Sequence, residues 1–317
     1  MQSVKQIVVV VLSGCFACWN AGCAAAGQRG LEPLNDAGVD ASSQQDAAAI
    51  VDAMVQPDSV VDSAVDSAVD AADPCVSSEY IFTDTAESFT VPQDVRYMII
   101  KAWGSGANEE EQCANNTGKG GPGGYTAAVL DVSASASLIT AGSTVSVVVG
   151  RRVHLNETSS DVALHGFAAS GGGGLSGVFT GAFPLIAAQY SRAVVIAGGG
   201  GSAGSQNASN CTIGYPGNHS TGGGMNDMQG GAGAHDDLNG GGGGYRGGLG
   251  GAWGQSGYGG DAFVRTHADV LDSRVEYQTP GTWTAPMTAD PDYIGAAGAS
   301  QEPGLVVIRF VCTEPSL

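Results

Sequence analysis

The chain has 317 residues, of which 43% are hydrophobic and 14% are charged, and its formal net charge is −19. No stretch of it is basic, so the sequence excludes a nucleic-acid partner bound through phosphate neutralisation and argues against attraction to anionic lipid headgroups. The length leaves room for one large domain or two small ones once leader and linker segments are subtracted.

Residues 1–23 have the composition of an export signal. Lys5 supplies a positive charge, Ile7–Leu12 supplies an apolar run, and small residues follow, which is the order of a cleaved leader. The run is far shorter than the roughly 20 residues that span a bilayer. No other segment is long and apolar enough to cross a membrane, so we expect export without a membrane span.

The motif Leu-Ser-Gly-Cys that ends at Cys15 resembles the lipobox of bacterial lipoproteins, whose cysteine receives lipid and becomes the first residue of the mature chain. The resemblance implies that Cys15 is lipidated and that the lipid is the only membrane anchor. Cys23 is the alternative, although Asn20 stands where the motif has Leu or Val, and a plain secretory signal is the third possibility. Neither cysteine is followed by Asp, which implies an outer-membrane lipoprotein, displayed at the cell surface, rather than retention at the inner membrane.

Residues 24–74 predict a disordered tether. The composition collapses to Ala, Asp, Ser, Val and Gln, and nine Asp and one Glu against one Arg give a net charge of −9. The four-residue repeat between Asp58 and Asp70 would stack like charges on a helix, and no aromatic residue is present to build a core. Tails of this composition after a lipobox resemble those of myxobacterial surface lipoproteins.

Residues 75–317 predict one all-β domain. Short β-rich runs bounded by Gly or Pro recur along it, and no window has the period of an amphipathic helix. The stretch Asp269–Asp292, with three prolines, is expected to be irregular. The predicted strands are Tyr80–Thr83, Glu87–Val91, Val95–Trp103, Gly124–Val132, Ser143–Gly150, Ala193–Ala197, Asp261–Arg265 and Leu305–Val311.

Four cysteines lie beyond the leader, and in an exported chain they predict two disulfides with three connectivities open. The pairing that we favour joins Cys75 to Cys312, which bracket the domain, and Cys113 to Cys211, which lie in polar loops. Beyond the leader no CxxC or HxxxH spacing occurs, so no metal site or cofactor is expected there.

Glycine occupies 26 of the 63 positions between Gly198 and Gly260, directly after the apolar run Ala193–Ala197. Because glycine has no side chain to pack, backbones in this stretch must pack on one another, or the stretch is disordered. Either arrangement is a poor setting for catalytic side chains, which need packed neighbours to hold them in place.

Glycine-rich and apolar motifs recur in a fixed order along this domain: Phe89–Pro92, Val95–Ile100, Ala102–Gly106, Gly120–Tyr125, Val147–Gly150, Val195–Gly201, Gly240–Tyr245 and Gly304–Phe310. This series resembles bacterial and phage glycine-rich domains, and also the extracellular glycine-rich domain of the anaplastic lymphoma kinase receptor family. The resemblance covers about residues 80–311 and implies a tumour-necrosis-factor-like β-sandwich whose inserted glycine segments bundle as left-handed, three-residue helices of the polyproline II type.

Two short patterns resemble catalytic or cofactor motifs. Gly199–Gly204 matches G-x-G-x-x-G, but no helical period follows it, as a dinucleotide site requires. The same residues place Ser202 in G-x-S-x-G, which needs a strand-to-helix turn together with an acid and a histidine. An exported hydrolase that uses Ser202 is therefore the alternative to a domain without catalysis.

Aromatic residues among the glycines are the candidate ligand contacts. Tyr245, Trp253 and Tyr258 offer flat faces that suit sugars or proteins, although they could equally cover the bundle. We expect a surface-anchored, non-enzymatic module for binding, adhesion or a structural role. By analogy with the family, its partner would be a glycan or a cell-surface protein.

Overall fold

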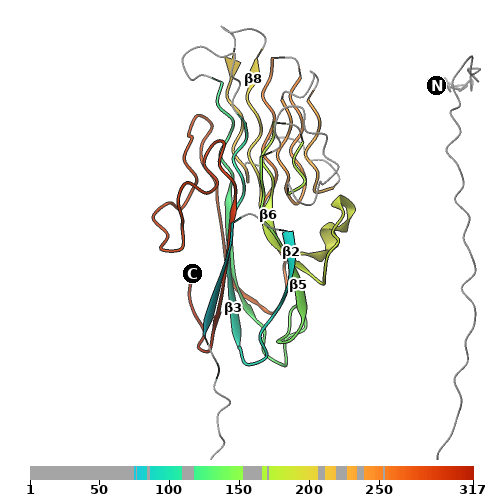
Figure 1. Cartoon of the computed structure of the whole chain (residues 1–317), viewed down its shortest axis with the longest axis vertical. Coiled ribbons are helices and arrows are strands. Elements are labelled where there is room, and N and C mark those ends of the chain that lie inside the picture. Colours follow the sequence, from blue (N-terminus) through green and yellow to red (C-terminus); the bar gives the residue numbers. More distant parts are fainter. Residues whose placement is uncertain are drawn as a thin grey trace, which may run out of the picture. The chain divides into compact units, whose positions relative to one another are not determined.

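Alternating apolar residues build two five-stranded antiparallel sheets that pack face to face (Figure 1). The computed structural model describes residues 75, 77–83, 86–108, 118–152, 166–169, 171–205, 211–218, 227–233, 239–252 and 254–317. The expected tether and the two candidate lipidation sites, Cys15 and Cys23, lie outside these residues.

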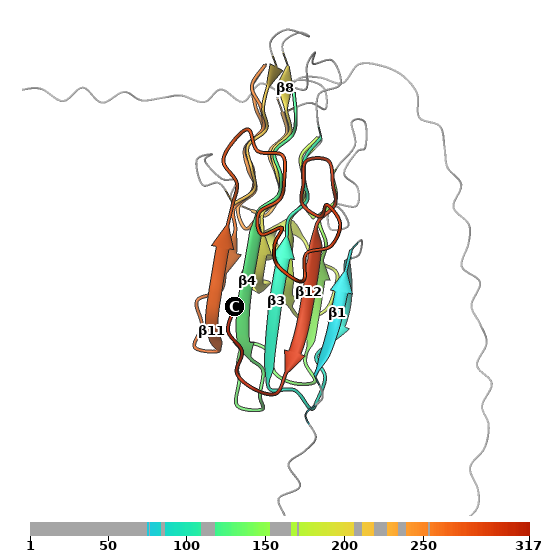
Figure 2. The ribbon, with the colours of Figure 1, turned by 90° about the vertical axis from the view of Figure 1, so that its left-hand side faces the viewer.

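The first sheet contains the chain's two terminal strands. Its order is β1-β12-β3-β4-β11, with antiparallel pairing throughout (Figure 2). The bounds are β1 Ser78–Phe82, β12 Leu305–Val311, β3 Tyr97–Trp103, β4 Tyr125–Asp131 and β11 Val270–Glu276.

The second sheet has the order β10-β7-β6-β5-β2 and is also antiparallel. A 3-10 helix, η2 (Ala187–Arg192), leads into its buried strand β7. The bounds are β10 Phe263–Val264, β7 Ala193–Ala197, β6 Ser176–Thr180, β5 Thr144–Val148 and β2 Ala86–Thr90, and a separate ribbon pairs β8 Gly204–Ser205 with β9 Cys211–Thr212.

The prediction of an all-β sandwich is confirmed, but two strands differ from the prediction. Residues 270–276 were expected to be irregular, but they form β11 at the edge of the first sheet. Most of their side chains are exposed, so the apolar alternation that marks a half-buried strand is missing there. Strand β6 was not predicted either, because only Val178 and Phe179 among its five residues are large and apolar.

The core lies between the sheets and has a satellite on each outer face. Side chains from alternate positions of both sheets fill the centre, among them Met98, Ile100 and Val147. A cluster around Phe179 and Ile196 covers the outer face of the second sheet. The irregular segment 277–304, which we call the excursion, covers the outer face of the first sheet around Trp103.

The strands give the domain two distinct ends. At one end, here called the base, Tyr97 pairs with both Val311 and Asp131. The Cys75–Cys312 disulfide lies at this end, next to the start of β1 and the end of β12, as the sequence predicted. At the opposite end, the strands run on into glycine-rich segments that extend as far as β8 (Figures 1 and 2).

These segments, residues 104–108, 118–124, 171–174, 198–203, 214–218, 239–251 and 257–260, form what we call the glycine layer. Residues 198–203 are its central segment. Backbone N–H groups three positions apart donate to the same neighbouring segment. Gly198 and Gly201 donate to segment 215–218, at the Asn218 side chain and the Tyr215 carbonyl. In the same way, Gly199 and Ser202 donate to the carbonyls of Gly243 and Gly240, and Gly200 and Ala203 donate to those of Ser105 and Asn108. The bonding period is therefore three, as in a polyproline II helix, and not two, as in a strand.

The carbonyl groups of the central segment accept hydrogen bonds from three further segments, and carbonyls three positions apart again share a segment. They accept bonds at 2.8–3.0 Å from the segments 121–124, 257–260 and 171–174. The segment is thus enclosed by other stretches of main chain, and its backbone hydrogen bonds are made between segments. The prediction that backbones pack directly on one another is confirmed for the described residues.

Glycine is required in the central segment for space. A Cβ added at Gly200 would lie 2.0 Å from the carbonyl oxygen of Gly121, and one added at Gly199 would lie 2.0 Å from that of Gly173. Neither residue has a φ in the left-handed region. The constraint is therefore the close approach of neighbouring backbones rather than an unusual conformation.

We expect Gly200→Ala to lower the free energy of unfolding by about 3 kcal/mol or more, because the methyl group would overlap fixed backbone. Gly295→Ala is the matched control: its Cβ would meet nothing within 4 Å, and only its φ of +62° opposes alanine, at a cost of about 1 kcal/mol. Urea unfolding of both variants measures the difference. Equal losses would show that steric exclusion in the glycine layer is not the constraint.

Candidate functional site

A cleft of about 550 Å³ opens on the glycine layer near the ribbon of β8 and β9. Residues of 211–215 and 255–258 form its walls, and Pro280 of the excursion borders it. Inside it, the rings of Tyr215 and Tyr258 lie stacked with their centroids 4.7 Å apart and their planes within 12°. In this stack each half-buried ring covers one face of the other, so the pair offers the outer face of a ring and the ring edges.

The glycine layer holds the backbones of both tyrosines. The Tyr215 N–H donates to the Gly257 carbonyl at 3.2 Å, and the Tyr258 N–H donates to the Leu249 carbonyl at 2.9 Å. Because their neighbours along the chain are Gly, Pro or small residues, the rings can project from the layer without filling its interior. The aromatic surface is therefore carried by hydrogen-bonded main chain.

Polar side chains border the aromatic pair. Gln255 and Thr212 are exposed, and Ser256 is buried beside them. The Thr212 hydroxyl is oriented by the carbonyls of Gly204 and Gly254, each at 3.3 Å. Among the described residues that line the cleft, none carries a charge.

Of the aromatic residues singled out in the sequence, only Tyr258 is found in this cleft. Tyr245 stacks on Phe263 with centroids 3.9 Å apart, contacts Tyr190 edge-on and packs against the cluster on the outer face of the second sheet. Trp253 lies outside the described residues. The sequence analysis missed Tyr215, whose ring partner lies 43 positions away; its signal was the glycine-flanked motif Gly214-Tyr215-Pro216-Gly217.

Ser202 is part of the central segment. Its side chain is buried, and its hydroxyl donates to the Gly240 carbonyl at 3.1 Å. The chain continues from it toward β8 and not into a helix. The one histidine that the structure describes, His267, contacts Asp269 just before β11. The geometry around Ser202 therefore lacks the strand-to-helix turn of a nucleophile elbow.

Of the two predicted disulfides, the structure confirms the bond between Cys75 and Cys312. Cys75 and Cys312 are bonded, with their Cα atoms 5.7 Å apart. Cys211, on the wall of the cleft, is also in a disulfide. Its predicted partner, Cys113, lies outside the described residues.

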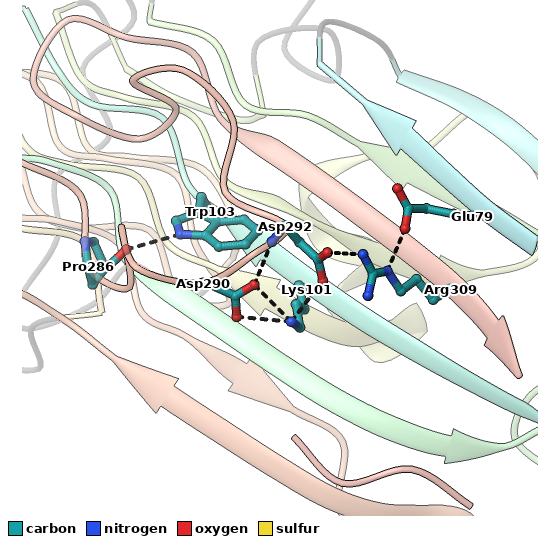
Figure 3. A network of polar contacts seen from close by, with 7 residues as sticks. All are labelled: Glu79, Lys101, Trp103, Pro286, Asp290, Asp292 and Arg309. Carbon is teal, nitrogen blue, oxygen red and sulfur yellow. Dashed lines mark hydrogen bonds and ion pairs between the residues drawn. The ribbon is translucent and has the colours of Figure 1, made fainter. Parts of the chain in front are cut away.

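An ionic network with a buried centre and an exposed end fixes the excursion to the first sheet (Figure 3). Lys101 of β3 contacts Asp290 at 2.9 Å and Asp292 at 2.8 Å, and all three side chains are at most 13% exposed. Arg309 of β12 joins Asp292 to Glu79 of β1. The network thereby connects three strands with the segment whose other end borders the cleft.

Two ring groups contact the same part of the excursion. The Trp103 indole donates to the Pro286 carbonyl at 3.0 Å (Figure 3). Burial, and then the Asp290 carboxylate, raise the pKa of the Tyr125 phenol well above its ordinary value. Tyr125 therefore stays protonated in the folded domain at pH values where an exposed tyrosine ionises.

Asn218 connects the glycine layer to the first sheet. Its side-chain oxygen accepts from the Gly198 N–H at 2.7 Å, and its amide nitrogen donates to the carbonyls of Tyr125 at 2.9 Å and Glu276 at 3.0 Å. Its φ of 64° is one that asparagine tolerates. Asn218 also matches a glycosylation sequon, but the nitrogen that would carry the sugar is buried and bonded.

Within the described part of the chain, no group of three or more His, Cys, Asp or Glu is arranged to hold a metal ion. The same residues contain no helix with the length and apolar character needed to cross a membrane. No protein-family model matches the chain, and no curated protein matches it either.

We expect Asn218→Ala to cost about 2–4 kcal/mol of stability, because it leaves one buried donor and two carbonyls without partners. Asn239→Ala is the control, since Asn239 is also buried and left-handed, with φ 71°, but donates one long bond of 3.3 Å, to Ala252. Asn239→Ala should lower the free energy of unfolding by about 1 kcal/mol. Similar losses in the two variants would contradict the anchoring role of Asn218.

Stability should fall at alkaline pH through Tyr125. The unfolded chain loses the phenol proton near pH 10 while the folded domain retains it, so stability present below that pH is lost as pH rises, by up to about 1.4 kcal/mol per unit. Denaturant titrations between about pH 9 and about pH 11 measure this slope. Tyr125→Phe should show a shallower slope, and an unchanged slope would contradict the assignment.

Proposed function

We propose that this protein is an exported lipoprotein that displays a non-enzymatic binding module at the cell surface. Two features support the proposal independently. The first is the leader, whose Cys15 lies in a lipobox-like motif, and the second is the arrangement of the domain, whose two ends differ. The observation that carries it is that Cys75, where the predicted tether joins, is disulfide-bonded at the base. The glycine layer and its cleft occupy the opposite end.

The two-ended arrangement suits display. A chain of some 50 residues with the disorder that the composition predicts would reach roughly 40 Å. A lipid at Cys15 would then hold the base near the membrane while the glycine layer points outward. Because loops of the layer are fixed by backbone bonds, a partner would meet a preorganised surface and lose less entropy on binding. The partner proposed by analogy is a glycan or a cell-surface protein.

No observation on Ser202 favours the hydrolase alternative, because its hydroxyl is buried and bonded to a backbone carbonyl. The binding proposal is favoured instead by an open cleft with aromatic and neutral polar walls. Such walls provide contact area and orientation for a ligand.

Lipidation is tested in the native host with the full chain and a clickable palmitate analogue. We expect Cys15→Ser to abolish labelling and to move the protein from the membrane fraction to the soluble exported fraction. Cys23→Ser is the matched control and should behave as the unmodified protein. If Cys15→Ser is still labelled and Cys23→Ser is not, the lipid is attached to Cys23, and the assignment to Cys15 is contradicted.

Display is tested on intact cells with a membrane-impermeant amine reagent and a periplasmic protein as the internal control. We expect Lys119, in a glycine-layer segment, to be modified on intact cells. Modification only after the outer membrane is permeabilised would contradict surface display.

A further inference from the structure

We infer that the cleft formed by residues 211–215 and 255–258 binds a neutral saccharide on the stacked rings of Tyr215 and Tyr258. This inference rests on the proposed function of a binding module and names its ligand class. Three properties of the cleft support it: the shape of the aromatic surface, the absence of charge among the described lining residues, and the polar groups at its border.

The shape of the aromatic surface favours a flat, apolar ligand face. Because the two rings are stacked within 12° of parallel, each covers one face of the other, and the flat surface left for a ligand is the outer face of one ring. A cationic ligand such as a quaternary ammonium is recognised by several rings that surround it, and parallel rings cannot do this. The C–H face of a pyranose, by contrast, lies against a single ring plane, and tyrosine adds a polar edge to that contact.

The charge of the cleft favours a neutral ligand. Recognition of carboxylate or sulfate groups relies on Arg or Lys, and none lies among the described lining residues. Residues 75–317 carry ten Lys or Arg against 21 Asp or Glu, which gives a net charge of −11. An anionic saccharide would therefore be repelled by the domain as a whole.

The border of the cleft supplies groups that can form hydrogen bonds with sugar hydroxyls. The exposed Gln255 amide can both donate and accept. The Thr212 hydroxyl directs its proton to a backbone carbonyl and can accept from a sugar hydroxyl. The volume of about 550 Å³ lies within the range of small-ligand sites. The size and the open mouth suit one or two sugar units of a longer chain.

The test uses the full-length exported protein and a panel of neutral tetrasaccharides of glucose, mannose, galactose and N-acetylglucosamine. Saturation-transfer NMR detects binding, and calorimetry gives the Kd. We expect at least one neutral tetrasaccharide to bind and an oligogalacturonate, the charged counterpart, not to bind. Binding of the oligogalacturonate alone, or of no member of the panel, would overturn the inference.

Variants locate the site. Tyr258→Ala should weaken binding by about tenfold or more, whereas Tyr258→Phe, which keeps the ring, should weaken it only a few-fold. Gln255→Ala, a change at an exposed side chain, gives a second probe that leaves the layer intact. Tyr190→Ala, an exposed tyrosine on η2 outside the cleft, is the matched control and should bind normally. Unchanged binding in both Tyr258→Ala and Gln255→Ala would overturn the inference.

The inference and the proposed function can fail separately. If the protein is displayed and binds whole cells while no neutral saccharide binds, the saccharide inference falls and the binding module stands. If the protein is absent from the cell surface, the proposed function falls whatever the saccharide panel shows.

Discussion

Close packing of main chain against main chain is the constraint on which the rest of this domain depends. The central segment 198–203 is enclosed by other glycine-rich segments, and its N–H groups bond with a period of three. Its neighbours come from three connections of the sandwich, between β3 and β4, between β5 and β6, and between β7 and β10. The layer can therefore form only when the strands place these connections together. The layer in turn fixes the loops, which would otherwise be long and mobile.

This constraint decides where function can reside. Inside the layer, added Cβ atoms would meet backbone at about 2 Å, so the interior has no room for a pocket of working side chains, and Ser202 is buried there as a structural hydroxyl. Only side chains that project from the layer are available for recognition. Tyr215 and Tyr258 do so as one stacked pair.

Much of the fold was predictable because it depends on local pattern. Alternation such as Val145, Val147 and Val149 identified core strands, and the bracketing positions of Cys75 and Cys312 indicated their bond. Strand β11 was not predictable in this way, since an exposed edge strand has no apolar face. Only part of the cleft was predicted. Tyr258 was singled out from the sequence, but its stacking on Tyr215 depends on how two glycine segments meet in space, and the sequence pattern does not indicate this.

Hydrogen exchange at the glycine amides tests the central claim most directly. If main-chain bonds fill the interior of the layer, the amides of Gly199, Gly200 and Gly201 should exchange only through global unfolding, at the same slow rate as those of Ile100 in β3 and Ile308 in β12. Exchange of these glycine amides within seconds, while the strand amides remain protected, would contradict the account.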